Sequence, residues 1–238
     1  MSKWLKTKAV LHDPHVRKHV PETRRMTAQS LRLMLDRYAM VYIKPDAGSY
    51  GKGVMRVEKN GGKYSYQTEE KKRIFDSFSL LYRSILLHKR NRPYLVQKGI
   101  HLLKYKGRRF DIRVMVQRNF QKKWEMTGMI GRVAHPKRIV TNYHSGGKPM
   151  EIRTLLTPLT SGATRTRIIN NIAATGYAAA IALSRKYPKL VAVGADIGLD
   201  TDFRPWIIEL NTSPDPYIFR HLPNKNVVRK ILRYTRSN

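Results

Sequence analysis

The order of apolar and polar positions in the first third of the chain predicts a short helix followed by strands. Leucine and methionine recur at helical spacing within residues 27–38, which predicts a helix there. The apolar run at 40–45 is typical of a strand that stops at its proline. Residues 53–59 and 63–67 flank Asn60-Gly61-Gly62, a sequence that favours a hairpin turn because Asn-Gly readily adopts positive φ.

A longer helix is predicted over residues 68–90, from Thr68 onward. Glu69 and Glu70 would lie in its first turn and basic residues in its last, as the helix dipole favours. One apolar face would be formed by Ile74, Phe75, Phe78, Leu81, Ile85 and Leu86.

The pattern of the remaining residues predicts further strands, a glycine-rich loop at 142–148 and a long helix at about 164–187. The strands are expected at 94–100, 110–119, 123–134, 190–200 and 204–211. Because helices and strands alternate irregularly, the pattern indicates an α+β fold and not a doubly wound parallel sheet.

Composition excludes several classes of protein. The chain has 238 residues, of which 41% are hydrophobic, so it can form a packed core and disorder is not expected. No apolar run reaches the roughly 20 residues that span a bilayer, and the N-terminal sequence does not resemble a secretory signal. Cysteine is absent, which excludes disulfides, thiolate catalysis and cysteine-based zinc sites and fits a reducing cytoplasm.

The charge is strongly positive. With 47 Lys and Arg against 16 Asp and Glu, the formal net charge is +31, which attracts nucleic acid, anionic membranes, acidic polymers and nucleotide phosphates. A solvated basic surface is the alternative explanation. The sequence contains no zinc finger, basic-zipper or RNP-type motif, so the charge suggests an anionic partner without identifying it.

A lysine on a predicted strand precedes a glycine-rich loop. Glycines allow backbone N–H groups to face phosphate oxygens, and the lysine would add a fixed cation beside them. The spacing is not that of a Walker A loop, and the order is not that of a kinase. A hairpin with incidental glycines is the alternative. The candidate phosphate-binding residues are Lys44, Gly48, Ser49, Gly51, Lys52 and Gly53.

Two carboxylates and an amide form a candidate metal site. Glu209 and Asn211 are two positions apart on a predicted strand, so their side chains share a face. A neighbouring antiparallel strand would bring Asp196 beside them. Such oxygen ligands suit Mg²⁺, with Mn²⁺ as an alternative. Scattered acids on a surface hairpin would explain the pattern without a metal.

A third group combines arginines with a polar loop. Arg113 and Arg132 would grip a phosphoryl group or a substrate carboxylate through their planar guanidinium groups, and Asn142 follows in the glycine-rich loop. A surface ion pair between Asp111 and Arg113 is the simpler interpretation of this segment alone.

Together these segments, in this order, resemble the ATP-grasp superfamily, and within it the YheC/YheD family of endospore coat-associated proteins. The resemblance covers roughly residues 20–220. It is carried by residues 21–27 (PETRRMT), 41–54 (VYIKPDAGSYGKGV), 94–100 (YLVQKGI), 108–117 (RRFDIRVMVQ), 141–148 (TNYHSGGK) and 194–214.

The resemblance implies that ATP lies between two α+β lobes. Lys44 and the loop 48–53 would hold its phosphates, and Gln97, Lys98 and Ile100 would form the hinge against adenine. Asp196, Glu209 and Asn211 would hold two Mg²⁺. Arg113 and Arg132 would face the γ-phosphate and an acyl phosphate, and Asn142 is expected in the same catalytic set.

The implied organisation is a basic segment at 1–20, an ATP-grasp domain at 21–220 with lobes at about 21–98 and 99–220, and a basic segment at 221–238. Two departures from the superfamily stand out. The usual N-terminal substrate domain is mostly lacking before residue 21, and an earlier phosphate-binding lysine has no clear equivalent, for which Arg24 or Arg25 would substitute.

The resulting hypothesis is an ATP- and Mg²⁺-dependent ligase that activates a carboxylate and joins it to an amine or other nucleophile. The acceptor would be an acidic peptide or polymer, and the location cytoplasmic or spore-associated. The alternative is a non-catalytic spore-associated, polyanion-binding or nucleic-acid-binding protein that retains the fold.

Overall fold

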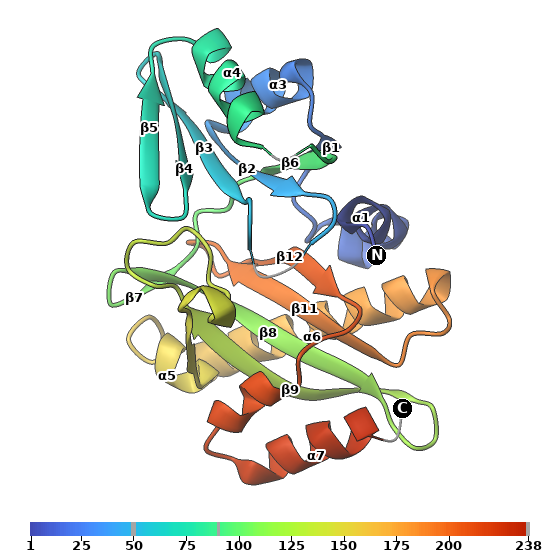
Figure 1. Ribbon diagram of the computed structural model, residues 1–238. Helices are drawn as coiled ribbons and strands as arrows, with labels where there is room; N and C mark the ends of the chain where they lie inside the picture. Colours follow the sequence, from blue (N-terminus) through green and yellow to red (C-terminus); the bar gives the residue numbers. More distant parts are fainter. Residues whose placement is uncertain (49–50, 90, 237–238) are drawn as a thin grey trace.

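The computed structural model describes residues 1–48, 51–89 and 91–236, which form two lobes (Figure 1). The N-terminal lobe is an antiparallel sheet with strand order β1-β6-β2-β3-β4-β5, covered on one face by helices α3 and α4. Its elements are β1 (Thr23–Arg25), α3 (Ala28–Tyr38), β2 (Met40–Pro45), β3 (Met55–Asn60), β4 (Lys63–Thr68), β5 (Lys71–Phe75), α4 (Phe78–His88) and β6 (Tyr94–Lys98).

Local sequence explains most of this lobe. Thr27 and Ser30 form a capping box at the start of α3, which then buries Leu31, Met34 and Leu35 in the core. The predicted hairpin forms with Asn60 opposite Lys63, and both intervening glycines have positive φ. The strand at 40–45 is confirmed as β2.

The helix predicted over 68–90 is wrong in its first half. Residues 71–75 form strand β5, which pairs with β4, and α4 begins only after Ser77, whose side chain accepts a hydrogen bond from the Leu80 N–H. Ile74 is 64% exposed and so does not join the predicted apolar face. Glu69 adopts positive φ in the β4–β5 turn, which ends any helical path through the acidic pair.

The C-terminal lobe is a second antiparallel sheet with order β10-β9-β8-β11-β12, and the short β7 pairs with β8. Its strands are β7 (Lys104–Tyr105), β8 (Arg108–Arg118), β9 (Trp124–Val133), β10 (Lys148–Met150), β11 (Ala192–Leu199) and β12 (Pro205–Asn211). Its helices are η1 (Tyr143–Ser145), α5 (Ile152–Leu156), α6 (Gly162–Lys186), η2 (Tyr217–His221) and α7 (Lys225–Arg236). The two antiparallel sheets with flanking helices confirm the α+β class.

Alternation along β8 gives the sheet of this lobe two different faces. Phe110, Ile112, Val114 and Val116 pack in the core beneath α5 and α6. On the opposite face Met115 packs under η2 and α7, while the residues at the other end of the strand are charged. The charged end of this face is directed toward the N-terminal lobe, and Asp111 there lines the space between the lobes.

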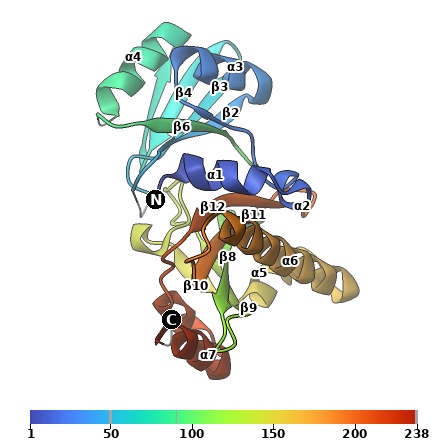
Figure 2. The same ribbon diagram turned by 90° about the vertical axis from the view of Figure 1, so that its right-hand side faces the viewer.

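Residues 1–20 form helices α1 (Lys3–Leu11) and α2 (Pro14–Arg17), which lie where the lobes meet (Figure 2). The Asp46 carboxylate of the N-terminal lobe accepts hydrogen bonds from the Ser2 hydroxyl and the Trp4 N–H at the start of α1, each at 2.8 Å. Farther along, the buried Lys6 Nζ donates to the Leu210 carbonyl of β12 at 2.5 Å. The helix therefore connects both lobes.

The expected boundaries at residues 20, 98 and 220 stay a prediction. Across the described ranges, every helix is too short or too polar to cross a membrane.

Replacing Gly176 by alanine is expected to destabilise the protein by about 1–3 kcal/mol, because α6 lies directly on β8 and overpacking strains a close contact. A methyl group there would lie 2.8 Å from Val114 Cβ and 2.7 Å from its Cγ1. At other helix positions a Gly→Ala change stabilises the protein by up to about 1 kcal/mol. The sign of the change in unfolding free energy therefore tests the close contact. Urea unfolding measures it, with the exposed Asn171→Ala on the same helix as control; equal stabilisation by both would contradict this packing.

Candidate functional site

A cleft lies between the two lobes, with an empty volume of about 910 Å³ when open solvent is included. It brings together most of the predicted site residues. Those that line it are Lys44, Gly48, Gly51, Lys52, Gln97, Lys98, Ile100, Arg132, Asn142, Asp196 and Glu209. Gly53, Arg113 and Asn211 lie outside its lining, and Ser49 lies outside the described residues.

Lys44 is half-buried on β2 and reaches into the cleft. Its Nζ donates to Gln97 Oε1 at 2.7 Å, and it lies 3.5 Å from the Ile208 carbonyl of the opposite lobe. Burial lowers the pKa of Lys44 to about 8, although Glu209 and Asp196 partly offset the effect. Near pH 8 the Lys44 side chain is therefore only partly charged, and an anion in the cleft would favour the charged ammonium.

Three glycines after β2 adopt backbone conformations that other residues rarely adopt. Gly48, Gly51 and Gly53 all have positive φ, which non-glycine residues rarely adopt. At Gly53 a Cβ atom would also lie 3.1 Å from the Tyr94 hydroxyl. The glycines let the chain turn tightly at the cleft, with Lys52 in the lining.

The floor of the cleft is a buried network of charges from three strands. Arg132 of β9 donates from Nε to Asp111 Oδ1 at 2.8 Å, and its Nη2 is 3.0 Å from Asp196 Oδ2. Arg113 of β8 makes a two-pronged contact with the Asp196 carboxylate. Burial alone would raise the pKa of Asp196, but the two guanidinium groups hold it below its usual range.

This network corrects the simple interpretation of the Asp111 segment. Asp111 pairs with Arg132 across the sheet and not with Arg113, and all of these groups are buried. Arg132 lines the cleft as predicted, whereas Arg113 lies behind Asp196.

Strand register brings the candidate metal ligands together. Asp196 lies opposite Glu209, and Gly194 lies opposite Asn211, in the antiparallel pair β11–β12. The register shifts between Asp196 and Ile197, so Ile208 and Glu209 both line the cleft despite being adjacent in sequence. Lys44 and Glu209, which come from different lobes, therefore face one space.

Lys3 is a cleft residue that the sequence did not indicate. Its Nζ donates to the Gly48 carbonyl at 2.6 Å and lies 3.3 Å from Glu209 Oε1. Arg24 and Arg25, the expected substitutes for a second phosphate-binding cation, are directed elsewhere: Arg24 pairs with Glu22, and Arg25 lies over the Trp4 ring. Lys3 was hidden in a basic run, which carries no spacing signal.

Two residues of the predicted hinge, Gln97 and Lys98, contact other side chains of the protein. Gln97 is buried, and its amide bridges Lys44 Nζ and the Thr23 hydroxyl, so it orients the lysine. The Lys98 ammonium lies over the Tyr38 and Trp206 rings. The cleft is also lined by apolar side chains that the sequence did not single out, namely Tyr42, Val54, Leu102, Ile139 and Ile208 beside Ile100.

The loop that carries Asn142 reaches across to the N-terminal lobe. Asn142 Oδ1 accepts the His144 N–H and caps η1. Earlier in the loop, the Lys137 carbonyl accepts a hydrogen bond from Gln67 Nε2 at 2.9 Å, and Arg138 lies 3.8 Å from Glu70. The cleft is therefore closed on this side by contacts between the lobes.

The side-chain oxygens of Asp196, Glu209 and Asn211 fit a magnesium ion only if a bound polyphosphate supplies further oxygen ligands. Both Asp196 oxygens already accept from arginines, and Asn211 Nδ2 lies 3.4 Å from one of them. Glu209 lines the cleft and lies 3.3 Å from Lys3 Nζ, whereas Asn211 lies outside the lining. Mg²⁺ commonly takes one or two carboxylates plus phosphate oxygens and water, which these residues match. In the described parts of the chain, no group of three or more His, Cys, Asp or Glu could hold a metal ion.

Comparison with known proteins identifies a family for the chain. A family model for YheC/D-like ATP-grasp proteins matches residues 1–237. Two relatives are the endospore coat-associated proteins YheD and YheC of Bacillus subtilis (strain 168). YheD is 26% identical over 202 residues, which cover 82% of this chain and 44% of YheD. YheC is 22% identical over 218 residues, which cover 86% of this chain and 58% of YheC.

A solved structure, the ADP complex of N5-carboxyaminoimidazole ribonucleotide synthetase (purK), has a TM-score of 0.55 and 11% identity, covering 98% of this chain and 50% of that chain. At this identity the likeness concerns the fold alone, and together with the family model it confirms the expected ATP-grasp fold. The chain spans about half the length of the curated relatives it matches. Since the family model matches nearly every residue, the chain belongs to the YheC/D-like ATP-grasp family.

Proposed function

We propose that the protein is an ATP-dependent ligase that activates a carboxylate and transfers it to an amine or similar nucleophile. The observation that carries the proposal is the meeting of Lys44 and Glu209 in one cleft. Lysines suited to phosphates and an oxygen ligand suited to Mg²⁺ thus face the same space. A merely basic protein has no need of this arrangement.

ATP would be bound by groups with distinct chemistry. The apolar side chains around Ile100 and Tyr42 suit the adenine ring, while Lys44 and the loop 48–53 suit the phosphates. Lys3, held between Gly48 and Glu209, would add a second cation. Glu209, with Asn211 and Asp196 behind it, would hold Mg²⁺, which shields the charge of the phosphates when bound.

The reaction would proceed in two displacements. A carboxylate oxygen of the acceptor attacks the γ-phosphorus, the bond to the β–γ bridging oxygen breaks, and ADP leaves with an acyl phosphate formed. A neutral amine then attacks the acyl carbon, phosphate leaves, and the amine loses a proton. Arg132, in the cleft lining, would stabilise charge on the transferred phosphoryl group, and Arg113 would hold Asp196 in place. Asn142 would contribute its amide from the closing loop.

An acidic peptide or polymer is the proposed acceptor, because the chain carries a net charge of +31. The proposed location is the cytoplasm or the spore, since the named relatives are endospore coat-associated.

The decisive experiment measures ADP release with ATP, Mg²⁺ and a panel of acid and amine pairs that includes acidic peptides. Release that depends on an added acid supports the ligase, and Glu209→Gln is expected to lower it on the order of a hundredfold. The matched control is the exposed Asp202→Asn, in the turn of the same β11–β12 hairpin. MgATP binding without acid-dependent release would instead indicate a nucleotide-binding protein that has lost catalysis.

ATP affinity is expected to fall as the pH rises through about 8, because Lys44 has a lowered pKa of about 8 and only its charged form attracts phosphate. Below that pH the ammonium is charged and the affinity is flat; above it, the dissociation constant should rise toward tenfold per pH unit. Calorimetric titration between about pH 7.5 and 9.5 measures this slope. Lys44→Gln should bind weakly with no such slope, and a flat wild-type profile would refute the role.

Lys3→Gln is expected to weaken ATP binding about tenfold, the scale of one charge-assisted hydrogen bond. The control is Lys8→Gln, an exposed position on the same helix, which should leave binding within twofold of wild type. Equal effects of the two substitutions would show that Lys3 acts only through general charge.

A further inference from the structure

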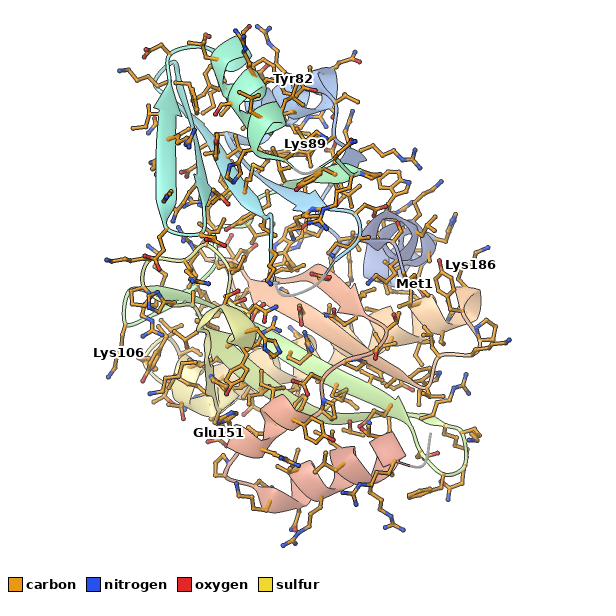
Figure 3. All side chains as sticks on the ribbon, viewed as in Figure 1. Met1, Tyr82, Lys89, Lys106, Glu151 and Lys186 are labelled. Atoms are coloured by element: carbon orange, nitrogen blue, oxygen red, sulfur yellow. The ribbon has the colours of Figure 1, made fainter. Side chains whose placement is uncertain are left out.

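Helix α7 presents a row of arginines to solvent. Residues 216–238 contain six Lys and Arg and no Asp or Glu. Arg229, Arg233 and Arg236 are exposed and, with Leu232, line one shallow groove along the helix. At about 1.5 Å per residue the row is about 10 Å long. Nitrogen-tipped side chains of α7 extend away from the molecule at the end opposite the cleft (Figure 3).

The other side of α7 is fixed to the sheet. Val228 and Ile231 are buried against Met115 and neighbouring side chains. Gln117 Nε2 donates to the Ile231 carbonyl at 3.2 Å and to the Thr235 hydroxyl at 3.0 Å. The apolar stripe is thus already used within the fold, so the helix cannot insert it into a membrane, and the arginine row has a fixed orientation.

An exposed aromatic ring lies beside this row. Phe120, at the tip of the β8–β9 hairpin, is 46% exposed. The Arg233 guanidinium lies 4.7 Å from its ring centroid, and the Tyr234 ring meets it edge-on at 5.2 Å. Lys122 and Lys123 follow in the same hairpin tip and are exposed. Cations beside an accessible aromatic ring suit a ligand that is both anionic and planar.

Glu125, an acid that contacts α7, is paired with two side chains of that helix. Glu125 of β9 accepts from Lys230 Nζ at 2.5 Å and from the Tyr234 hydroxyl at 2.8 Å. This pairing anchors α7 beside the β8–β9 hairpin.

We propose that the α7 surface, defined as Arg229, Arg233 and Arg236 with Phe120, binds single-stranded nucleic acid. Guanidinium groups match phosphate oxygens in two-pronged contacts, and a row about 10 Å long meets about three successive phosphates. A base unstacked from its neighbours covers Phe120. A polymer of glutamate or aspartate offers no ring to stack there, and a duplex keeps its bases inside. The surface is separate from the ATP cleft and does not depend on the ligase proposal.

The test is fluorescence anisotropy with a labelled oligothymidylate of about 15 nucleotides, at salt concentrations of about 50 and 200 mM. Arg229→Gln/Arg233→Gln/Arg236→Gln should weaken binding at least tenfold and reduce the log–log salt slope by about 2, or about 0.7 per phosphate contact. The matched control is Lys71→Gln/Lys72→Gln/Arg73→Gln on the exposed strand β5, which removes the same charge from the other lobe. That variant should bind within twofold of wild type.

Phe120→Ala should weaken oligonucleotide binding about fivefold or more with the salt slope unchanged, as expected for loss of base stacking. Equal losses in the two triple variants would overturn the assignment to α7. If a glutamate polymer or a duplex of equal length binds as tightly as the oligonucleotide and Phe120→Ala has no effect, the single-stranded nucleic acid assignment is wrong. ATP affinity should be unchanged in every variant. A loss of oligonucleotide binding then cannot be attributed to damage in the ATP cleft.

Discussion

The buried charges beneath the cleft depend on one another, and the cleft depends on them. Asp111, Arg113, Arg132 and Asp196 have side chains at most 10% exposed, and they come from β8, β9 and β11. A single buried charge is costly, so each can be buried only because the others pair with it. Slipping any of these strands by one residue pair would leave a charge unpaired. The network therefore fixes the register of β8, β9 and β11, and with it the place of Asp196 in the cleft.

A second constraint fixes the distance between the lobes. Helix α1 holds Asp46 of the N-terminal lobe at its first turn and reaches the Leu210 carbonyl through Lys6. A carboxylate at a helix start is favoured by the dipole, and burial lowers the pKa of Lys6, which marks how far its ammonium is withdrawn from water. With the start of α1 anchored to both lobes, Lys3 lies between Gly48 and Glu209.

Sequence patterns singled out cleft residues that have unusual neighbours in sequence, and missed cleft residues that are placed by tertiary contacts. Lys44 and Glu209 stood out because a lysine before glycines and an acid in an apolar strand are unusual within a few positions. Lys3 did not, since its neighbours in sequence are ordinary and its partners lie far along the chain. The apolar positions of residues 71–75 fit a helix as well as a strand, and only pairing with β4 decided between them.

The net charge of the chain and the charge of the cleft are separate properties. The lining of the cleft carries five Lys and Arg against Asp111, Asp196 and Glu209, which leaves a net charge of only +2 there. Most of the +31 therefore lies elsewhere. A nucleotide needs a few charges at fixed positions and countercharges that orient them, whereas a polymer responds to rows of like charge on an open surface. The cleft has the first arrangement and α7 the second, so the charge that first suggests phosphate binding explains the exterior better than it explains the cleft.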